Sequence, residues 1–286
     1  MILVTGATGN IGREVVKQAA AVGVRVRALV RDAKKAAPLK GRNVELFEGS
    51  FDDPASLDAA LRGAEKVFLL TPSDPGLVET QGRLLEAARR ARVQHVVKLS
   101  ALGASLGSPV SLGRWHAQAE KAIFDSGVPY TILRPNYFMQ NVLDFAPSIM
   151  ATGTFYAPMK DARVSAVDVR DIASVAVAVL TGIEHEGLTY DITGPEALSF
   201  SDMAARIGAA THQPVNYVDV APPKAKEHLR AARLPEWLVE ALLAIYAEFV
   251  AGHGAAVSTV VEELTGYPAR GFDEFAREHV MAFRGN

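Results

Sequence analysis

Three glycines near the start of the chain, Gly6, Gly9 and Gly12, have the spacing of a loop that binds the phosphates of a nucleotide. The loop follows a short apolar run and leads directly into a helical pattern. Glycine allows a sharp turn and a close approach of the backbone to a pyrophosphate, and the free N–H groups of the next helix favour an anion. A glycine-rich turn that binds nothing is the alternative interpretation. We expect the contacts to a dinucleotide to come from Gly6, Thr8, Gly9, Asn10, Ile11 and Gly12.

The end of the second apolar run carries the residues that would distinguish NADP from NAD. This run ends in Arg31 and Asp32. A guanidinium can donate two parallel hydrogen bonds to a 2′-phosphate, whereas a carboxylate would accept from the 2′-hydroxyl of NAD. Lys34 and Lys35 add positive charge nearby. We therefore expect NADP(H), with NAD as the less favoured cofactor; a solvated charged turn without a ligand is the alternative.

A histidine and a glutamate, His116 and Glu120, stand four residues apart in a helical pattern. This spacing places both side chains on one face of a helix, within reach of each other. Histidine titrates near neutral pH, so His116 could deliver a proton to a molecule that receives a hydride. A hydrogen bond on the helix surface, with no catalytic part, is the alternative.

Other reaction classes lack the residues that they need. The seven histidines show no His-Glu-x-x-His spacing or similar cluster, so we expect no metal site. The Gly-x-Ser-x-Gly motif of a hydrolase is absent. The chain contains no cysteine, which removes thiol nucleophiles, thiolate metal sites and disulfides.

The elements that would position these residues alternate between strands and helices. Six apolar runs, most of them without strict alternation, are typical of strands covered on both faces; they span residues 2–4, 24–30, 44–47, 66–70, 95–99 and 130–133. With helical patterns between them, they predict an α/β fold with a Rossmann-type doubly wound parallel sheet. Ligands of such a sheet bind beyond the carboxyl ends of its strands, so Thr71, Pro72 and Ser100 should line the nicotinamide end.

The pattern changes after Leu133, where Arg134, Pro135 and Asn136 should stop the strand because proline lacks a ladder donor. A helix over 169–180 and a strand over 188–192 follow. Further helical patterns span 200–211, 222–232, 235–250, 257–264 and 272–283. We expect a Rossmann domain of residues 1–135 plus 163–194, and a smaller helix-rich C-terminal lobe of residues 136–162 plus 195–286 on the substrate side.

Residues of this second lobe are candidates for a substrate wall. Asn136, Tyr137, Phe138 and Met139 leave the sixth strand at its carboxyl end and should face the cofactor. Methionine and aromatic side chains there could form an apolar wall for a planar ligand, and hinge packing is the alternative. Later in the chain, an apolar helical stripe is typical of core, with a substrate lid as the alternative. The stripe consists of Trp237, Leu238, Ala241, Leu242, Ile245, Tyr246 and Phe249.

The composition of the 286 residues is that of an ordinary folded protein, with 49% hydrophobic and 22% charged residues. Thirty Lys and Arg residues against 32 Asp and Glu residues give a net charge of −2, so the chain has no global field that would attract nucleic acid. We find no pattern of a signal peptide and no apolar stretch of the roughly 18 residues that a spanning helix needs. These observations predict a cytoplasmic protein without nucleic-acid or membrane partners.

The Gly-x-x-Gly-x-x-Gly spacing resembles the short-chain dehydrogenase/reductase superfamily. Further segments resemble its atypical NmrA-like branch, which includes quinone and triphenylmethane-dye reductases as well as non-catalytic redox sensors. These segments span residues 5–12, 29–31, 96–103 and 130–135. The resemblance covers nearly the whole chain.

The resemblance implies roles for further residues. Lys35 would be a second contact to the 2′-phosphate, and Asp52 would lie beside the adenine, although Asp53 next to it is equally typical of a helix start. A typical short-chain dehydrogenase carries Tyr-x-x-x-Lys on the helix after the fifth strand, and this chain lacks that pair. His116 and Glu120 resemble instead the His-x-x-x-Glu of the quinone and dye reductases.

The expected function is an NADPH-dependent reductase, a monomer or homodimer, that transfers hydride to a small planar aromatic acceptor such as a quinone, an azo compound or a triphenylmethane dye. Such acceptors are strongly electrophilic, so the protein needs mainly to hold them against the nicotinamide and exclude water. Because Tyr-x-x-x-Lys is absent, a non-catalytic NADP(H)-binding redox sensor that docks to a partner protein is the alternative. An isomerase or dehydratase that retains its cofactor is a third interpretation, which no residue singles out.

Overall fold

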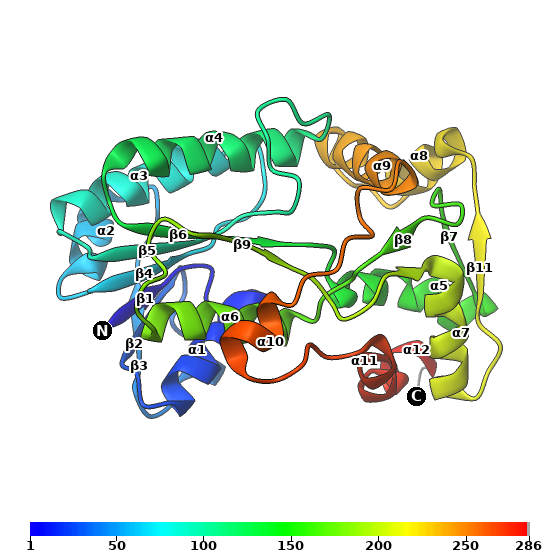
Figure 1. Ribbon diagram of the computed structural model, residues 1–286, viewed down its shortest axis with the longest axis horizontal. Coiled ribbons are helices and arrows are strands. Elements are labelled where there is room, and N and C mark those ends of the chain that lie inside the picture. The colour runs from blue at the N-terminus through cyan, green and yellow to red at the C-terminus, as the bar shows by residue number, and fades with distance from the viewer. Residues whose placement is uncertain (285–286) are drawn as a thin grey trace.

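A seven-stranded parallel sheet forms the centre of the computed structural model, which describes residues 1–284 (Figure 1). The strand order is β3-β2-β1-β4-β5-β6-β9. The strands are β1 (Ile2–Val4), β2 (Val26–Val30), β3 (Val44–Glu48), β4 (Lys66–Leu69), β5 (His95–Leu99), β6 (Tyr130–Pro135) and β9 (Thr189–Ile192). From β1 the sheet grows in one direction through β2 and β3 and in the other through β4, β5, β6 and β9. The predicted doubly wound α/β sheet is therefore confirmed.

Helices cover both faces of this sheet (Figure 1). On one face lie α2 (Pro54–Leu61), α3 (Leu77–Arg90) and α4 (Ser111–Ser126); on the other lie α1 (Asn10–Ala21), α6 (Val169–Thr181) and α10 (Val260–Thr265). Successive strand residues point to opposite faces, so Leu3 packs in the first core and Val4 in the second. Burial on both faces explains why the strands are continuous apolar runs.

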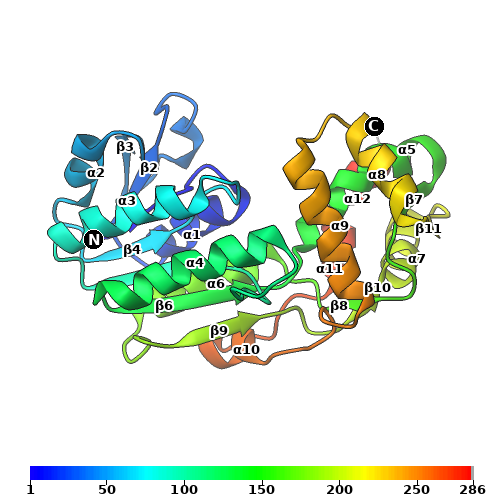
Figure 2. The ribbon, with the colours of Figure 1, turned by 90° about the horizontal axis from the view of Figure 1, so that it is seen from above.

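The second lobe lies beside the carboxyl ends of β6 and β9 and has a core of its own (Figure 2). Its helices are α5 (Ala146–Thr152), α7 (Phe200–Thr211), α8 (Pro222–Ala231), α9 (Glu236–Val250), α11 (Phe272–Glu278) and α12 (Val280–Arg284). Two small sheets join β7 (Thr154–Ala157) to β11 (Asn216–Asp219) and β8 (Arg163–Val164) to β10 (Leu198–Ser199). Short 3-10 helices, η1 (Ala37–Leu39) and η2 (Met139–Phe145), complete the elements. Aromatic rings fill the core, with Phe155 and Phe200 at 5.9 Å between centroids.

Several predicted boundaries are wrong. The sixth strand continues through Arg134 to Pro135, because proline at the last strand position still offers its carbonyl, which accepts a hydrogen bond from Leu102 N at 2.9 Å. The single helix expected over 272–283 is two helices that meet at His279. The four strands of the two small sheets were not predicted, because a strand of only two to four residues shows little periodicity in its sequence.

The proposed division into two units remains a prediction, and the packing of α10 refines it. Val261 of α10 is 2% exposed and belongs to the core between α6 and the sheet. A division that assigns residues 260–265 to the first unit therefore agrees better with the packing than one that assigns them to the C-terminal lobe.

His95 opens β5 at the amino edge of the sheet and makes the stability of the fold sensitive to acid. Its side chain is 1% exposed, and its Nε2 lies 2.8 Å from Thr131 Oγ1. Burial lowers the pKa of His95 from 6.5 to about 4, although Glu186 opposes the shift. Below pH 6.5 the unfolded chain therefore binds a proton that the folded chain does not, and stability falls as the pH drops towards 4.

His95→Gln should reduce this loss of stability. Between pH 7 and 4.5 the variant should lose on the order of 2 kcal/mol less free energy of unfolding than the unmodified chain, because glutamine does not titrate. Urea unfolding at a series of pH values measures the difference. His228→Gln on α8, at an exposed histidine, is the control and should keep the original pH dependence. Equal pH slopes for the His95 variant and the control would contradict the prediction.

Candidate active site

The glycine loop forms a tight turn between β1 and α1. Gly6 has φ +62°, and a Cβ at Gly6 would lie 2.7 Å from Leu70 Cγ. A Cβ at Gly12 would lie 2.2 Å from the carbonyl oxygen of Gly6. A larger residue at Gly12 would force the backbone to shift, and one at Gly6 would have to displace Leu70 and adopt a left-handed backbone conformation. The loop is therefore the tight, closely packed turn that glycine at these positions predicts.

The N-terminus of α1 is suited to an anion. Gly9 precedes the helix and makes no side-chain cap, and the first turn contains no acidic residue. Its N–H groups and the positive end of the helix dipole are thus available to phosphate oxygens. Thr8 and Asn10 are exposed beside these groups, whereas Ile11 is buried. On these observations the loop fits a dinucleotide.

Thr5 joins the loop to the neighbouring strand, a contact that the sequence did not reveal. Its Oγ1 donates to Leu70 O at 2.8 Å and accepts from Leu70 N at 2.9 Å. The side chain is fully buried. These bonds hold the ends of β1 and β4 together, which sets the position of the glycine turn beside Thr71.

In the turn after β2, the side chain of Arg31 is exposed to solvent, whereas that of Asp32 bonds to the backbone of the turn itself. Asp32 Oδ1 accepts hydrogen bonds from the backbone N–H groups of Lys34 at 2.9 Å and Lys35 at 3.1 Å. The carboxylate thus stabilises the turn, and its Oδ1 is occupied by two backbone hydrogen bonds. Arg31 and Lys35 are both exposed. This arrangement suits a 2′-phosphate better than a 2′-hydroxyl.

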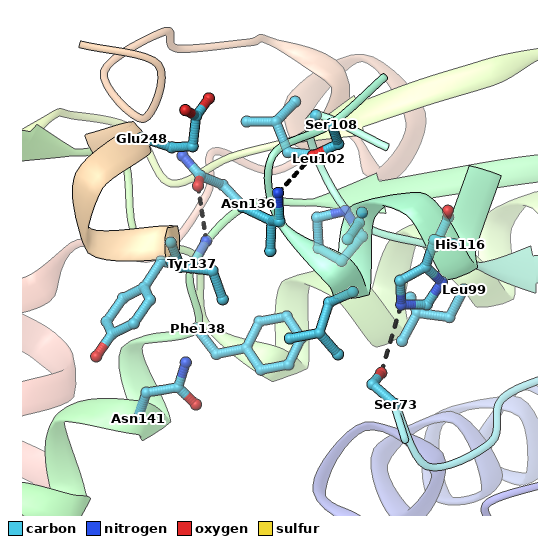
Figure 3. A pocket seen from close by; sticks show the side chains of 18 of the residues that line it. Ser73, Leu99, Leu102, Ser108, His116, Asn136, Tyr137, Phe138, Asn141 and Glu248 are labelled. Carbon is cyan, nitrogen blue, oxygen red and sulfur yellow. Dashed lines mark hydrogen bonds between the residues drawn. The ribbon is translucent and has the colours of Figure 1, made fainter. Parts of the chain in front are cut away.

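A pocket of about 340 Å³ lies beyond the carboxyl ends of β4, β5 and β6, where it meets the second lobe (Figure 3). Ile11 contributes to its wall, so the pocket adjoins the phosphate loop. Its lining residues come from both lobes and are mostly apolar: Ile11, Leu70, Thr71, Ser73, residues 99–103, Ser108, Val110, Leu112, Gly113, His116, residues 135–138, Asn141, Ile245, Glu248, Phe249 and His253. Thr71 and Ser100 line this pocket, whereas Pro72 is exposed and outside the lining. That these three residues lie at the nicotinamide end remains a prediction.

Three of the four residues predicted to form a substrate wall line the pocket. Asn136, Tyr137 and Phe138 line the pocket, but Met139 is 1% exposed and packs in the core of the second lobe. At Met139 the chain enters η2, which turns the side chain away from the pocket. The amide of Asn136 is occupied, because its Nδ2 donates to Ser165 Oγ and to Gly254 O, both at 2.8 Å. Met139 is therefore removed from the proposed substrate contacts.

His116 points into the pocket from α4 (Figure 3). Its Nε2 lies 3.4 Å from Ser73 Oγ and its Nδ1 lies 2.9 Å from Lys98 Nζ. Burial and the neighbouring Lys98 lower the pKa of His116 well below its usual range. Burial also lowers the pKa of Lys98 to about 7. The sequence pattern did not single out Lys98, although a lysine between the apolar residues Val97 and Leu99 is a visible signal.

A sequence model described as the NmrA-like family matches residues 1–276. The chain belongs to the NmrA-like family. The resemblance drawn from the glycine loop and the strand ends is thereby confirmed.

This NmrA-like chain is similar to one curated protein and two solved structures over nearly its whole length. It is 42% identical over 283 residues to an NAD(P)H azoreductase of Xenophilus azovorans, covering 99% of both chains. It is similar to the structure of the NADPH-dependent quinone oxidoreductase QOR2 of Escherichia coli complexed with NADPH, with 28% identity, a TM-score of 0.89 and coverage of 97% and 99%. It is also similar to the triphenylmethane reductase of Citrobacter sp. complexed with NADP(H), with 26% identity, a TM-score of 0.87 and coverage of 98% and 100%.

Glu120 has partners that differ from those expected for an NmrA-like His-x-x-x-Glu pair. It is 2% exposed, accepts from Ser100 Oγ and forms a two-pronged ion pair with Arg134, with 3.0 Å from Oε1 to Nε. Within residues 1–284 no hydrogen bond joins Glu120 to His116, and Glu120 is outside the pocket lining. The expected contact between the two side chains is thus wrong, and any catalytic part of Glu120 would be indirect.

Asp52 and Asp53 have separate places in this NmrA-like fold. Asp53 Oδ1 accepts from Ala55 N at 3.0 Å and caps α2, as expected of a helix start. Asp52 is exposed and pairs with Arg83 of α3. Its position beside an adenine remains a prediction.

Helix α9 contributes both to the core and to the pocket. Ile245 and Phe249 line the pocket, whereas Leu242 and Tyr246 pack in the core of the second lobe. At the start of α9, the ring of Trp237 lies 5.8 Å from that of Trp115 on α4, so the two lobes touch through these rings. The apolar stripe thus has core contacts, as it predicted, and also pocket contacts, and a substrate lid remains the alternative interpretation.

Two negative findings apply to the described part of the chain, residues 1–284. No group of three or more His, Asp or Glu side chains is arranged to hold a metal ion. No helix is both long enough and apolar enough to cross a membrane.

Proposed function

We propose that this chain is an NADPH-dependent reductase that transfers hydride to a planar electrophilic acceptor such as a quinone, an azo compound or a triphenylmethane dye. The observation that carries the proposal is the continuity between the phosphate loop and the apolar pocket, which share Ile11. A dinucleotide whose pyrophosphate lies on the loop would direct its nicotinamide to the strand ends that line the pocket. The names of the relatives agree with this reaction class.

The residues that would hold the cofactor follow from the same placement. The pyrophosphate would lie against residues 6–12, and Arg31 with Lys35 would bind the 2′-phosphate, which favours NADP over NAD. Asp52 would lie beside the adenine. Thr71, Pro72 and Ser100 would lie at the nicotinamide end, where a bound NADPH supplies the hydride.

The rest of the site would bind the acceptor and exclude water. Phe138, Tyr137 and Phe249 offer aromatic surface to a flat molecule, and the mostly apolar lining favours a planar ring over bulk water. His116 would donate a proton from Nε2 to an acceptor that becomes anionic when it receives hydride. Acceptors of this kind are reactive enough that the Tyr-x-x-x-Lys pair of alcohol dehydrogenases is not needed.

Oxidation of NADPH in the presence of an acceptor panel tests the proposal. The panel contains menadione, an azo dye and malachite green, and the reaction is followed by the loss of NADPH absorbance. We expect saturable turnover with at least one acceptor and a preference for NADPH over NADH. Tight NADPH binding with no turnover of any acceptor would overturn the reductase and favour the non-catalytic sensor.

His116→Gln should slow quinone reduction by about 100-fold or more, because glutamine cannot act as a general acid. Binding of NADPH, measured by calorimetry, should be unchanged. His253→Gln is the matched control, since His253 also lines the pocket but is exposed and pairs with Glu248. A rate for the His116 variant within twofold of the control would assign His116 to packing alone.

A further inference from the structure

Lys98 is an unusual residue for the centre of a sheet. It occupies the fourth position of β5, between two strands, and is 0% exposed. Within residues 1–284 no carboxylate forms an ion pair with its ammonium group. An unpaired charge in a protein interior is costly, so an apolar residue would be more stable at this position. The position of Lys98 therefore calls for a function.

The contacts of Lys98 lead towards the pocket. Its Nζ donates to Leu99 O at 3.1 Å and lies 2.9 Å from His116 Nδ1. Two further charges act on it, Glu120 from α4 and Arg134 from β6, and these raise and lower the pKa of Lys98 respectively. Burial has the largest effect, so the pKa lies at about 7 and the amine exchanges its proton near neutral pH.

This contact determines which side of the His116 ring carries the proton. A charged Lys98 has only donors, so Nδ1 at 2.9 Å must offer it a lone pair, and in a neutral imidazole the proton is then on Nε2. Nε2 is the nitrogen on the side of Ser73, at 3.4 Å from its hydroxyl, within the pocket wall (Figure 3). The neutral ring thus presents its Nε2–H towards the pocket, and it can give up this proton only if Nδ1 receives another.

We propose that Lys98 is a positioning residue that holds His116 with its protonated Nε2 towards the acceptor and resupplies, through Nδ1, the proton that His116 gives up. The inference rests on the proposed function. It adds a buried proton source on the Nδ1 side of His116, away from the pocket. The proton moves from Lys98 to His116 and from His116 to the acceptor.

The step balances for a quinone. A bound NADPH would supply the hydride and with it the electron pair, and one quinone oxygen would then need a proton. The Nε2–H bond of His116 breaks as the new O–H bond forms, and an Nζ–H bond of Lys98 breaks as the Nδ1–H bond forms. Lys98 is left as a neutral amine. A solvent proton taken up at Nε2 then returns the Nδ1 proton to Lys98.

A pair of acceptors separates this relay from a merely structural lysine. Menadione needs one hydride and one proton, whereas the cation malachite green needs only the hydride to become its neutral leuco form. Lys98→Met keeps a long apolar stem and removes the proton source. Lys66→Met is the matched control. Lys66 is the first residue of β4, at the amino ends of the strands and away from the pocket, and its Nζ donates to Gly182 O at 3.1 Å.

We expect Lys98→Met to lower kcat for menadione at least about tenfold more than kcat for malachite green. For menadione, the kcat of the original chain should also fall above about pH 7, and this decrease should be absent in Lys98→Met. The control should change both acceptors equally and little. Equal losses for the two acceptors in Lys98→Met, or no loss for either, would overturn the relay, whereas no turnover by the unsubstituted chain would instead refute the proposed function.

Nuclear magnetic resonance of histidine labelled with 15N gives a readout that is independent of activity. At pH 6, where Lys98 is charged and the lowered pKa of His116 keeps its ring neutral, His116 of the original chain should show a protonated Nε2 and an unprotonated Nδ1. In Lys98→Met, the preference for this tautomer should weaken, while Lys66→Met should retain it. A proton on Nδ1 in the original chain would overturn the proposal.

Discussion

Arg31→Ala is expected to weaken the binding of NADPH by about 10- to 100-fold and the binding of NADH by less than about twofold. A hydrogen bond to a charged group contributes about 1.5–3 kcal/mol, and a guanidinium can donate two of them to a phosphate. NADH has a hydroxyl in place of the 2′-phosphate, so it loses little. Arg31 is exposed at the end of β2, and alanine there leaves no buried group without a partner.

Isothermal titration of both nucleotides measures this difference. Arg42→Ala serves as the control, because Arg42 is also exposed but precedes β3 at the amino edge of the sheet. The control should change neither affinity. Lys35→Ala should give a smaller loss for NADPH than Arg31→Ala, since an ammonium binds a phosphate without the two-pronged geometry. Equal losses of NADPH and NADH in Arg31→Ala would refute the assignment of the 2′-phosphate.

The sequence predicted well those parts of the fold that follow from the alternation of strands and helices along the chain. Apolar runs that alternate with helical patterns require a parallel sheet, and a parallel sheet gathers its ligands at the carboxyl ends of its strands. Thr71 and Ser100, far apart in the chain, were expected in one wall for this reason, and both line the pocket. The glycine spacing likewise predicted a turn whose close packing the structure shows at Gly6 and Gly12.

The parts that were missed depend on side-chain direction and on partners distant in the chain. The four-residue spacing correctly placed His116 and Glu120 on one helix, but their hydrogen bonds are decided by β5 and β6, which supply Lys98 and Arg134. Periodicity on α4 cannot reveal those neighbours. Similarly, the side chain of Met139 turns away from the pocket because a 3-10 helix begins there, and such short elements have no clear sequence pattern.

The glycine loop offers the strictest test of the cofactor site, because its geometry leaves no room for a single methyl group. In Gly12→Ala, the new Cβ would lie 2.2 Å from Gly6 O, 2.7 Å from Gly6 C and 2.9 Å from Ala7 Cα. All three are backbone atoms, so the turn itself must move. Overpacking of this kind costs about 1–3 kcal/mol in stability. The folded variant should therefore persist, with its phosphate-binding turn displaced.

We expect Gly12→Ala to weaken the binding of both NADPH and NADH by about 100-fold or more, because both nucleotides share the pyrophosphate. This loss of both ligands distinguishes it from Arg31→Ala. Gly82→Ala in the interior of α3 is the matched control: a Cβ there meets no atom within 4 Å. The control should bind both nucleotides normally and gain about 0.5–1 kcal/mol in stability, since alanine is the better helix former. If Gly12→Ala has the circular dichroism of the original chain and still binds NADPH with undiminished affinity, the pyrophosphate does not lie on this turn, and the proposed orientation of the cofactor towards the pocket fails with it.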